Sequence, residues 1–390
     1  MEKSYDVVVV GAGPGGSMAA KRAAENGVSV LLLERDPSIG TPVECAEGIA
    51  TDGISTFFDP DPSWIATKIE GAILTSPSGR SCKVKVPGAG FILERKIFDR
   101  DLSILASRAG AEVFCSSNVV GLLHDDGRVS GVKVKYQGEE REIGAKVVIG
   151  ADGVGSMVGQ WAGMDTKLRS TEFHAAAEYL LGNVDVEENY PEFIAGTEIA
   201  PGGYAWVFPK GGGTANVGVG IVPFKAKLKP FDYCEALIQR RFPRASRIEK
   251  ISSAIPTTVL DEIVTEGVML VGDAARVTDP ITGGGIGNAI FSGEIAGRVA
   301  AGAVKKGDFS KKSLWAYQEE WEERFGFEMR YRYKAREIFL KLTDSDFEAI
   351  FDFAKNAFDG KVLTEVNPRE IILPLIKSTP RFLKLARHLL

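Results

Sequence analysis

Residues 5–36, with the sequence YDVVVVGAGPGGSMAAKRAAENGVSVLLLERD, decide the fold. An apolar run is followed by a glycine-rich turn, a stretch of small residues and a second apolar run. Near-continuous apolar runs are typical of parallel strands that are buried on both faces. The segment therefore predicts a βαβ unit in which the small residues form the connecting helix.

The turn in this unit has the spacing of a dinucleotide-binding loop. Gly11 permits the tight turn, Gly13 lets the backbone approach a pyrophosphate, and Gly16 permits close packing of the helix, whose first N–H groups face the anion. Glu34 follows Gly16 by 18 residues, at the end of the second strand, where its carboxylate could bind ribose hydroxyls. Together these features predict a dinucleotide site, with a purely structural turn as the alternative.

Two further glycine-rich loops follow predicted buried strands. Residues 150–156 read GADGVGS, and residues 270–289 read LVGDAARVTDPITGGGIGNA. In the second loop, Asp273 could bind a polyol hydroxyl, and the glycines lead into a helix whose N-terminal dipole stabilises negative charge. A nicotinamide dinucleotide needs no such polyol contact. The alternative is a pair of glycine-rich connectors.

The predicted nucleotide-binding domain is interrupted twice by short strand-like segments, and the chain after about residue 310 is helical, aromatic and charged. We therefore predict an α/β fold with a discontinuous Rossmann-type nucleotide-binding domain, a mixed β-sheet substrate domain and a C-terminal helical region. The predicted segments are residues 1–67, 95–165 and 263–310 for the first domain, 68–94 and 166–262 for the second, and 311–390 for the helical region.

The composition is that of a globular protein. With 390 residues, of which 44% are hydrophobic and 25% charged, the chain has enough apolar mass for about two to three domains. The formal net charge of −5 provides no basic field for nucleic acid, and the three scattered histidines have no metal-ligand spacing. The four cysteines include no C-x-x-C pair, which argues against a dithiol motif and a disulfide framework.

The sequence predicts a cytoplasmic protein. Residues 1–5 run directly into the first strand and leave no room for a signal peptide. Glycines and charged residues interrupt every apolar run before the roughly 18 residues that a membrane span needs. Any membrane contact is therefore expected to be peripheral.

The C-terminal segment is the expected place of such a contact. Residues 371–390 carry four basic groups and no acid. Phe382, Leu385, Ala386 and Leu389 share one face of a predicted helix. This pattern suits an anionic membrane surface, with packing against the protein itself as the alternative.

The three loops in this order resemble the flavoprotein superfamily of para-hydroxybenzoate hydroxylase, in which FAD lies extended across the first domain. More narrowly, four segments resemble the geranylgeranyl reductases, above all the archaeal digeranylgeranylglycerophospholipid reductases. These segments are PVECAEG at 42–48, LERKIFDRDL at 93–102, YAWVFP at 204–209 and GVG at 218–220. The similarity runs from residue 4 to about residue 340.

The resemblance implies FAD as the cofactor and assigns it binding residues. Gly15 and Glu34 would contact the adenosine diphosphate half. Arg95 would contact the phosphates or the ribityl chain, and Val119 the adenine region through its backbone. The residues implied around the ribityl and isoalloxazine half are Cys45, Ala46, Gly48, Asp273, Gly285 and Ile286.

Two positions depart from the resembling proteins. The related hydroxylases usually carry Arg near the end of the second loop, where this chain has Gly159, which removes a charged contact. Many of the reductases have Cys-Gly-Glu-Gly, where this chain has Ala46. The alanine narrows the available backbone angles and removes no functional group.

Cys45 is a candidate catalytic residue. A loop beside a bound isoalloxazine, followed by Gly48, favours a thiol that faces the flavin. The alternative is a small buried hydrophobic residue, a common role of cysteine. The thiol could donate a proton, polarise the flavin or shape the cavity. The neighbouring Glu47 is either functional or a solvated loop acid.

Tyr204, Trp206 and Phe208 alternate along a predicted strand and should project from one face. The resemblance implies that this face lines a channel for a prenyl chain, with packing against the core as the alternative. Aromatic faces could stabilise the positive charge that develops when hydride and a proton are delivered to an isolated double bond. The proton donor is expected at Tyr204, also a candidate catalytic residue, or in the Cys45 loop.

The function implied by the resemblance is FAD-dependent saturation of geranylgeranyl chains in archaeal-type membrane lipids. The partners would be a prenylated lipid and an electron donor, which is ferredoxin, reduced flavin or NAD(P)H. The alternatives are an aromatic-ring monooxygenase and a prenyl-binding escort protein without redox function. A monooxygenase would consume oxygen when given an aromatic substrate, whereas an escort protein would be colourless.

Overall fold

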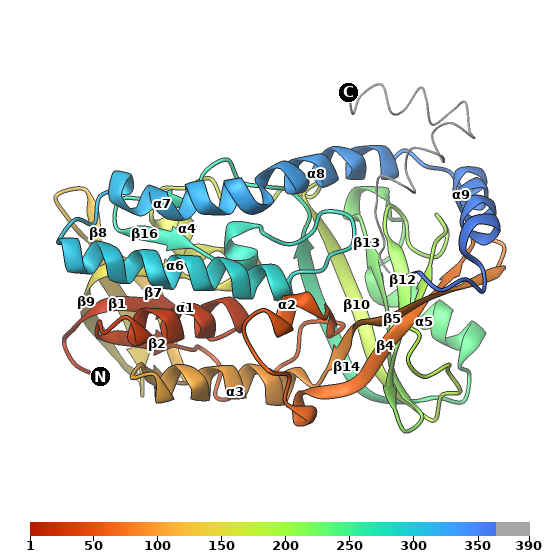
Figure 1. The fold of residues 1–390 in the computed structure, drawn as a ribbon, viewed down its shortest axis with the longest axis horizontal. Coiled ribbons are helices and arrows are strands. Elements are labelled where there is room, and N and C mark those ends of the chain that lie inside the picture. Colours follow the sequence, from red (N-terminus) through yellow and green to blue (C-terminus); the bar gives the residue numbers. More distant parts are fainter. Residues whose placement is uncertain (364–390) are drawn as a thin grey trace. The chain divides into compact units, whose positions relative to one another are not determined.

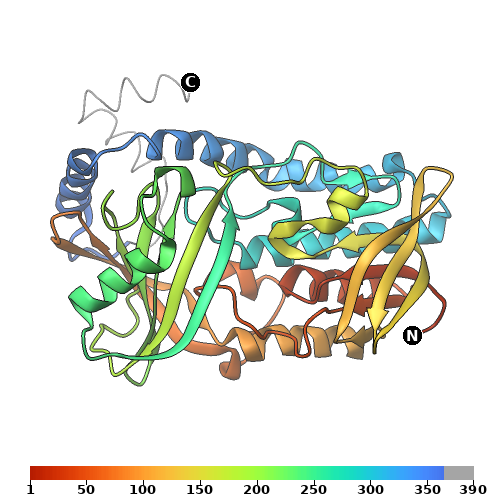
Figure 2. The ribbon, with the colours of Figure 1, turned by 180° about the vertical axis from the view of Figure 1, so that it is seen from behind.

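The computed structural model describes residues 1–363, and the chain divides into two compact units (Figures 1 and 2). The first unit comprises Met1–Val43, Arg95–Arg169 and Pro256–Arg330. The second comprises Glu44–Glu94, Ser170–Ile255 and the chain from Tyr331. Each unit is built around one eight-stranded sheet.

The sheet of the first unit has a parallel centre. β1 (Ser4–Val10) pairs in parallel with β2 (Val30–Leu33) and with β9 (Glu139–Gly150). β6 (Glu112–Phe114) extends the sheet beyond β2, and β16 (Val268–Leu270) extends it beyond β9, both in parallel. The central valines of β1 are fully buried, as expected for a strand that is covered on both faces. The predicted α/β fold is confirmed.

Helices α1 (Pro14–Glu25) and α6 (Ile286–Lys306) lie side by side in this unit (Figure 1). A Cβ atom on Gly293 of α6 would meet the carbonyl oxygen of Gly15 at 2.1 Å. The small residues of both helices therefore let the two backbones approach more closely than larger side chains would allow.

The remaining strands of the first unit include the antiparallel meander that the sequence predicts. β7 (Ser117–Asp125) and β8 (Arg128–Tyr136) join through a two-residue turn at Asp126, and β8 and β9 through one at Gln137. Both turn residues have positive φ angles of 45° and 52°, as hairpin turns of this length require. The other elements are α3 (Arg95–Arg108), η2 (Gly153–Gly155), α4 (Met157–Trp161), β15 (Val264–Thr265), η4 (Gly272–Ala275), α7 (Lys311–Trp321) and the π-helix η5 (Glu322–Gly326).

The second unit contains a mixed sheet with the strand order β14, β10, β13, β12, β11, β4, β5, β3. β11 pairs in parallel with β4, and its pairing with β12 is antiparallel. This unit begins at Glu44, earlier than the expected boundary at residue 67, because β3 pairs with β5. The strands are β3 (Gly48–Ala50), β4 (Ile65–Thr75), β5 (Ser81–Leu93), β10 (Phe173–Gly182), β11 (Glu192–Ile194), β12 (Tyr204–Gly211), β13 (Thr214–Ile221) and β14 (Ser246–Pro256).

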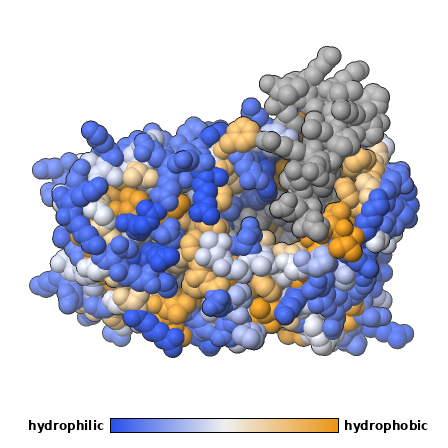
Figure 3. Space-filling model, in the orientation of Figure 1, coloured by the Kyte–Doolittle hydropathy of each residue, from blue (hydrophilic) through white to orange (hydrophobic). Residues whose placement is uncertain are grey.

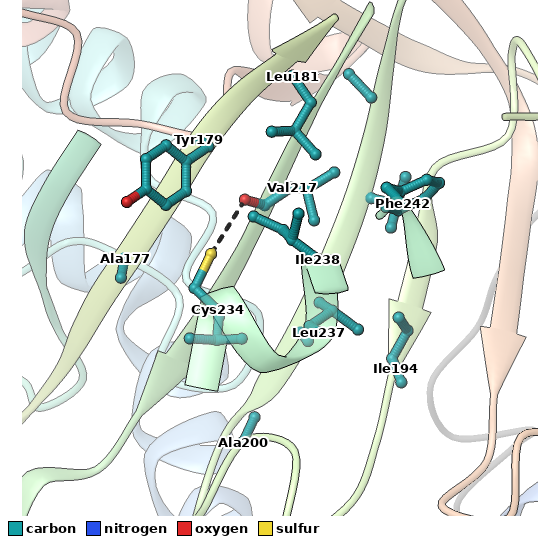
Figure 4. Close-up of a cluster of buried hydrophobic side chains, with 14 of the residues drawn as sticks. Ala177, Tyr179, Leu181, Ile194, Ala200, Val217, Cys234, Leu237, Ile238 and Phe242 are labelled. Carbon is teal, nitrogen blue, oxygen red and sulfur yellow. Dashed lines mark hydrogen bonds between the residues drawn. The ribbon is translucent and has the colours of Figure 1, made fainter. Parts of the chain in front are cut away.

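Helix α5 (Pro230–Arg241) covers one face of this sheet and forms a hydrophobic core with it (Figure 4). Cys234, Leu237 and Ile238 of the helix pack against apolar side chains of β10 and β13. The Cys234 thiol donates to the carbonyl oxygen of Val217 at 3.6 Å, and burial raises its pKa to about 12. Cys234 is therefore a packing residue. The unit also contains the short helices α2 (Asp52–Ser55), η1 (Pro62–Trp64) and η3 (Pro223–Lys225).

Two helices follow η5, namely α8 (Phe327–Phe339) and α9 (Asp344–Phe358). The Arg80 guanidinium in the β4–β5 turn contacts Glu348 and Asp352, which ties α9 to this hairpin. The predicted amphipathic face of Phe382, Leu385, Ala386 and Leu389 lies outside the described residues. Within residues 1–363, no helix has both the length and the apolar content needed to cross a membrane. Figure 3 shows one face of the molecule, on which hydrophilic residues predominate and apolar residues are interspersed.

Candidate functional site

The glycine loop after β1 forms a cradle at the N-terminus of α1. No side chain caps this helix, and a Cβ atom on its N-cap residue, Gly13, would meet nothing within 4 Å. A Cβ atom on Gly11 would instead meet the Ala151 carbonyl oxygen at 2.3 Å, and one on Gly16 the Gly11 carbonyl oxygen at 1.9 Å. The loop is thus closely packed at Gly11 and Gly16 and open at Gly13. Uncapped N–H groups beside open space fit the pyrophosphate of a dinucleotide.

The carboxylate of Glu34 lies against the same loop. Its Oε2 accepts a hydrogen bond from the Ala12 N–H at 2.8 Å, and its Oε1 accepts one from the Asp36 N–H at 3.0 Å. Glu34 is half-buried, directly after β2. Because each carboxylate oxygen has a further lone pair, the side chain can still accept hydrogen bonds from ribose hydroxyls.

The third loop brings Asp273, Thr278 and Gly285 together. The Thr278 hydroxyl donates to Asp273 Oδ1 at 2.6 Å, and a Cβ atom on Gly285 would meet Thr278 Oγ1 at 2.9 Å. Burial raises the pKa of Asp273, against the opposing effects of the Thr278 hydroxyl and of Arg95. Gly285 is the N-cap of α6, no side chain caps this helix, and Ile286 is its first buried residue. The loop therefore offers a polar pair beside a helix N-terminus.

The second loop contains a buried acceptor that the chain leaves unsatisfied. Asp152 Oδ2 accepts a hydrogen bond from the Val158 N–H at 2.9 Å, whereas its buried Oδ1 has no partner within the described residues. Burial raises the pKa of this carboxyl, and backbone N–H groups oppose the rise. A buried oxygen of this kind fits a hydrogen-bond donor of a bound cofactor.

Gly159 on α4 is closely packed. A Cβ atom at this position would meet Ser156 Oγ and Thr166 Cγ2, both at 2.7 Å. The space beside α4 is therefore filled, and a longer side chain has no room.

Arg95 and Val119 lie on other elements of the first unit. Arg95 begins α3 and forms a bidentate ion pair with Asp99, with distances of 2.7 Å and 2.6 Å. A cofactor phosphate at Arg95 would therefore share its guanidinium with a carboxylate. Val119 lies on β7 opposite Val134, and its side chain is buried.

Cys45 lies in a short loop of the second unit that is fixed by hydrogen bonds. The Glu47 N–H donates to Cys45 Sγ at 3.2 Å, and Glu47 has a left-handed φ angle of 72°. The Asn216 side-chain amide on β13 donates to the Ala46 carbonyl oxygen at 3.4 Å. A Cβ atom on Gly48 would meet the Phe208 ring at 3.2 Å, so this glycine allows the loop to lie against β12.

Glu47 is a buried acid and not the solvated loop acid that the sequence left open. It is only 4% exposed. The Lys210 ammonium contacts Glu47 Oε2 and also lies 3.1 Å from Glu94 Oε2, and Asn216 Nδ2 donates to Glu47 Oε2 at 2.8 Å. We call Glu47, Lys210, Glu94 and Asn216 the Glu47 cluster. Because buried charges are tolerated only when they are paired, this cluster holds the Cys45 loop against β12 and β13.

Tyr204, Trp206 and Phe208 lie on one face of β12, as their alternation predicts. Ring centroids of successive residues are 5.9 Å and 6.4 Å apart, and Phe193 of β11 adds a fourth ring 5.7 Å from Tyr204. Trp206 and Phe208 are 5% and 8% exposed and pack against other apolar side chains of the unit, whereas Tyr204 is half-buried. Burial, and secondarily Cys45, raises the pKa of Tyr204. The phenol therefore retains its proton at neutral pH.

Gly218 on β13 makes room for the Trp206 indole. The two residues lie opposite each other in the register, and a Cβ atom on Gly218 would meet Trp206 Cζ2 at 2.5 Å. The indole therefore extends across β13 towards β10. The glycines of the GVG segment thus serve this packing of the aromatic face.

Two titratable side chains of β10 are buried beside this face. Trp206 Nε1 donates to Glu178 Oε2 at 2.5 Å, while Glu178 Oε1 has no partner within the described residues. Burial raises the pKa of Glu178 well above its usual value, against the effect of the indole N–H. His174 is also buried, and desolvation together with Arg336 lowers its pKa to about 3. Burial therefore shifts Glu178 towards its neutral form, and His174 is neutral at physiological pH.

The predicted residues thus form two groups, one in each unit. The first group comprises the residues at the α1 and α6 N-termini together with Arg95 on α3 and Val119 on β7, and the second comprises the Cys45 loop and the aromatic face. Sequence reasoning missed Thr278, Phe193, Glu178, Lys210 and Asn216. Thr278 bonds to Asp273 within the same loop. The contacts of the other four join different strands or loops, for which the sequence contains no local signal. Among residues 1–363, no group of three or more His, Cys, Asp or Glu side chains could hold a metal ion.

Two family models match the chain. The model described as the geranylgeranyl reductase catalytic domain matches residues 172–256, and the model described as FAD dependent oxidoreductase matches residues 6–195. The first match covers the aromatic face, and the second includes the glycine cradle.

Similar proteins extend over almost the whole chain. The digeranylgeranylglycerophospholipid reductase of Methanothrix thermoacetophila is 42% identical over 98% of this chain and 99% of its own length. That of Methanosarcina acetivorans is 43% identical over 91% of this chain and 89% of its own.

Solved structures show the same fold. The crystal structure of a geranylgeranyl bacteriochlorophyll reductase-like protein from Thermoplasma acidophilum covers 100% of both chains, with 35% identity and a TM-score of 0.93. A flavin-dependent brominase has a TM-score of 0.68 over 99% of this chain and 93% of its own at 19% identity, a similarity that shows the fold alone.

Proposed function

Because the chain belongs to the geranylgeranyl reductase family of FAD-dependent oxidoreductases, we propose that it saturates the isolated double bonds of geranylgeranyl chains in archaeal membrane ether lipids. The observation that carries this proposal is its similarity, over 98% of its length, to a digeranylgeranylglycerophospholipid reductase. The open glycine cradle at α1 supports the FAD-dependent part.

The first unit supplies the binding groups for the cofactor in this proposal. Gly13 leaves the α1 N-terminus open to the pyrophosphate, and Glu34 holds the adenosine ribose. Asp273 and Gly285 interact with the ribityl side at the α6 N-terminus. The uncapped helix ends and the unsatisfied Asp152 oxygen support these roles. When bound, FAD supplies hydride chemistry.

The second unit supplies the groups that act on the prenyl chain. An isolated double bond has no carbonyl to withdraw charge, so the site must stabilise positive charge at a tertiary carbon. The contacting rings of Tyr204, Trp206 and Phe208 support such a role, because aromatic faces attract cations. The phenol of Tyr204 carries a proton at neutral pH and lies beside the Trp206 ring. Tyr204 is therefore our candidate proton donor, and Cys45 our candidate thiol at the reacting end.

The partners of the reaction follow from the same proposal. The lipid substrate is a prenylated glycerophospholipid, and the enzyme meets it through peripheral contact with a membrane. Electrons come from ferredoxin, reduced flavin or NAD(P)H.

Anaerobic reoxidation of the reduced flavoprotein tests this function. The purified protein, reduced with dithionite in the absence of oxygen, should regain its oxidised flavin absorbance when detergent-dispersed digeranylgeranylglycerophospholipid is added, and not when its saturated counterpart is added. Reoxidation only with oxygen, together with hydroxylation of an added aromatic compound, would favour the monooxygenase. A protein that purifies without flavin and cannot be loaded with FAD would favour the prenyl-binding escort.

A further inference from the structure

A short loop before α5 exposes apolar and basic side chains together. We call residues 224–229, with the sequence FKAKLK, the 224–229 loop. Phe224 and Leu228 are 54% and 58% exposed, so that this short loop exposes two large apolar side chains together. Lys225, Lys227 and Lys229 are also exposed and form no ion pair within the described part of the chain. The loop therefore presents two apolar groups among three cations.

Three backbone N–H groups of the loop donate hydrogen bonds that hold it in this conformation. The N–H of Lys225 donates to the Val222 carbonyl oxygen at 3.0 Å, the N–H of Lys227 to the Tyr233 hydroxyl at 3.1 Å and the N–H of Lys229 to Asp232 Oδ2 at 3.0 Å. Between the exposed lysines, Ala226 packs inward against the core beneath α5. The outward position of Phe224 and Leu228 is thus a feature of the fold.

The charge of this region is opposite to that of the protein. Residues 224–250 contain eight basic and three acidic side chains, a local excess of five positive charges, whereas the whole chain has a formal charge of −5. Two of the arginines, Arg241 and Arg247, are paired with Glu192 and Glu235. Lys250 lies 4.1 Å from the centre of the Phe231 ring, at the start of α5, which adds a fourth cation close to the loop.

We propose that the 224–229 loop is the membrane-docking surface of the protein and that it binds an anionic phospholipid surface. The lysines contact the phosphates of the headgroups, and Phe224 and Leu228 insert into the boundary between the headgroups and the acyl chains. Apolar side chains flanked by lysines fit a lipid surface, because anionic headgroups and apolar acyl chains adjoin there. This inference rests on the proposed function, because a prenylated phospholipid is found in membranes.

Vesicle sedimentation with the full chain tests the proposal. At low salt, the wild-type protein should bind phosphatidylglycerol vesicles and not phosphatidylcholine vesicles, both free of prenyl substrate. Combined Lys225→Glu, Lys227→Glu and Lys229→Glu substitutions should lower the partition coefficient at least about 100-fold, since each basic group near the surface contributes about one factor of five. Phe224→Ser with Leu228→Ser should lower it at least about tenfold.

Two control variants with the same change of charge accompany this experiment. The first control removes exposed lysines of the first unit by combining Lys305→Glu, Lys306→Glu and Lys312→Glu. Its vesicle partition coefficient should stay within about threefold of wild type once the effect of the changed net charge is subtracted. Arg381→Glu, Lys384→Glu and Arg387→Glu test the C-terminal segment. Flavin absorbance and the thermal midpoint of each variant confirm folding.

Four results would overturn the proposal. The first three are a wild-type protein that does not bind anionic vesicles, binding that only the C-terminal variant loses, and unchanged binding after Phe224→Ser with Leu228→Ser. The fourth concerns a protein partner. If the lysine variant keeps vesicle binding but loses reduction by an acidic electron-transfer protein, the loop binds that protein instead. Failure of this proposal can be distinguished from failure of the proposed function, because turnover of detergent-dispersed substrate does not need membrane docking. This turnover should be unchanged in the loop variants.

Discussion

Cys45 is the residue on which the proposed chemistry depends most. Its sulfur is fixed by the Glu47 N–H. We predict that Cys45→Ser retains FAD but loses a large part of turnover. The serine hydroxyl is similar in size to the thiol but lacks its acidity and polarisability. The measurement is steady-state reduction of the prenyl lipid at matched flavin content. Unchanged rates in this variant would remove the thiol from the mechanism.

Glu178 should make stability depend on pH. Because its folded-state pKa is raised above the unfolded value, the stabilisation is fully present below about pH 4 and is lost as pH rises towards the folded pKa, at up to about 1.4 kcal/mol per pH unit. Glu178→Gln mimics the protonated form and does not titrate. Urea unfolding of both proteins should therefore show an advantage of the Gln variant that grows from pH 5 upwards. An advantage that is independent of pH would show that Glu178 does not titrate differently in the folded state.

Removal of one member of the Lys210–Glu47 ion pair should destabilise the protein more than removal of both. Their side chains are 8% and 5% exposed. Lys210→Met leaves a buried carboxylate without its cation and should lower the free energy of unfolding by about 3–5 kcal/mol. Adding Glu47→Gln should restore most of this loss, as measured by urea unfolding in a double-mutant cycle. Purely additive losses would mean that the two residues stabilise the loop independently.

At the level of elements, the contact between α1 and α6 links the glycine cradle to the rest of the first unit. Gly293→Ala places a Cβ atom against the Gly15 carbonyl oxygen, so we expect a loss of about 1–3 kcal/mol in stability and weaker FAD binding. Gly302→Ala, on the same helix, meets nothing within 4 Å and should be neutral or stabilise the helix by up to about 1 kcal/mol. Thermal unfolding and FAD titration measure both effects. Equal behaviour of the two variants would contradict the packing argument.

The elements that could be predicted are those with a local signal. The parallel strands around β1 follow from their apolar runs, and the β7–β8–β9 meander follows from its two turns. The single face of Tyr204, Trp206 and Phe208 follows from alternation. In contrast, Phe193 joins these rings only because β11 pairs with β12, and Lys210 meets Glu47 across 163 residues of chain. Such contacts depend on the sheet topology, which periodicity does not encode.

At the scale of the whole molecule, the fold class and the cofactor could be predicted from the sequence, because the three glycine-rich loops each follow a strand of one sheet. The boundaries between units were harder to predict. The segment from Glu44 to residue 67 belongs to the second unit through the pairing of β3 with β5. The assignments of FAD-contacting, catalytic and substrate residues stay predictions, which the variants above test.

The most direct test of the central claim is mass spectrometry of lipids from a bacterial host that expresses this chain with a prenyl-ether lipid pathway. We predict that the geranylgeranyl chains of these lipids gain two hydrogens for each double bond that is reduced. A Gly13→Leu variant, which fills the open side of the cradle, should leave them unsaturated. Lipids that stay unsaturated with a flavin-loaded wild-type protein and a working electron donor would contradict the claim.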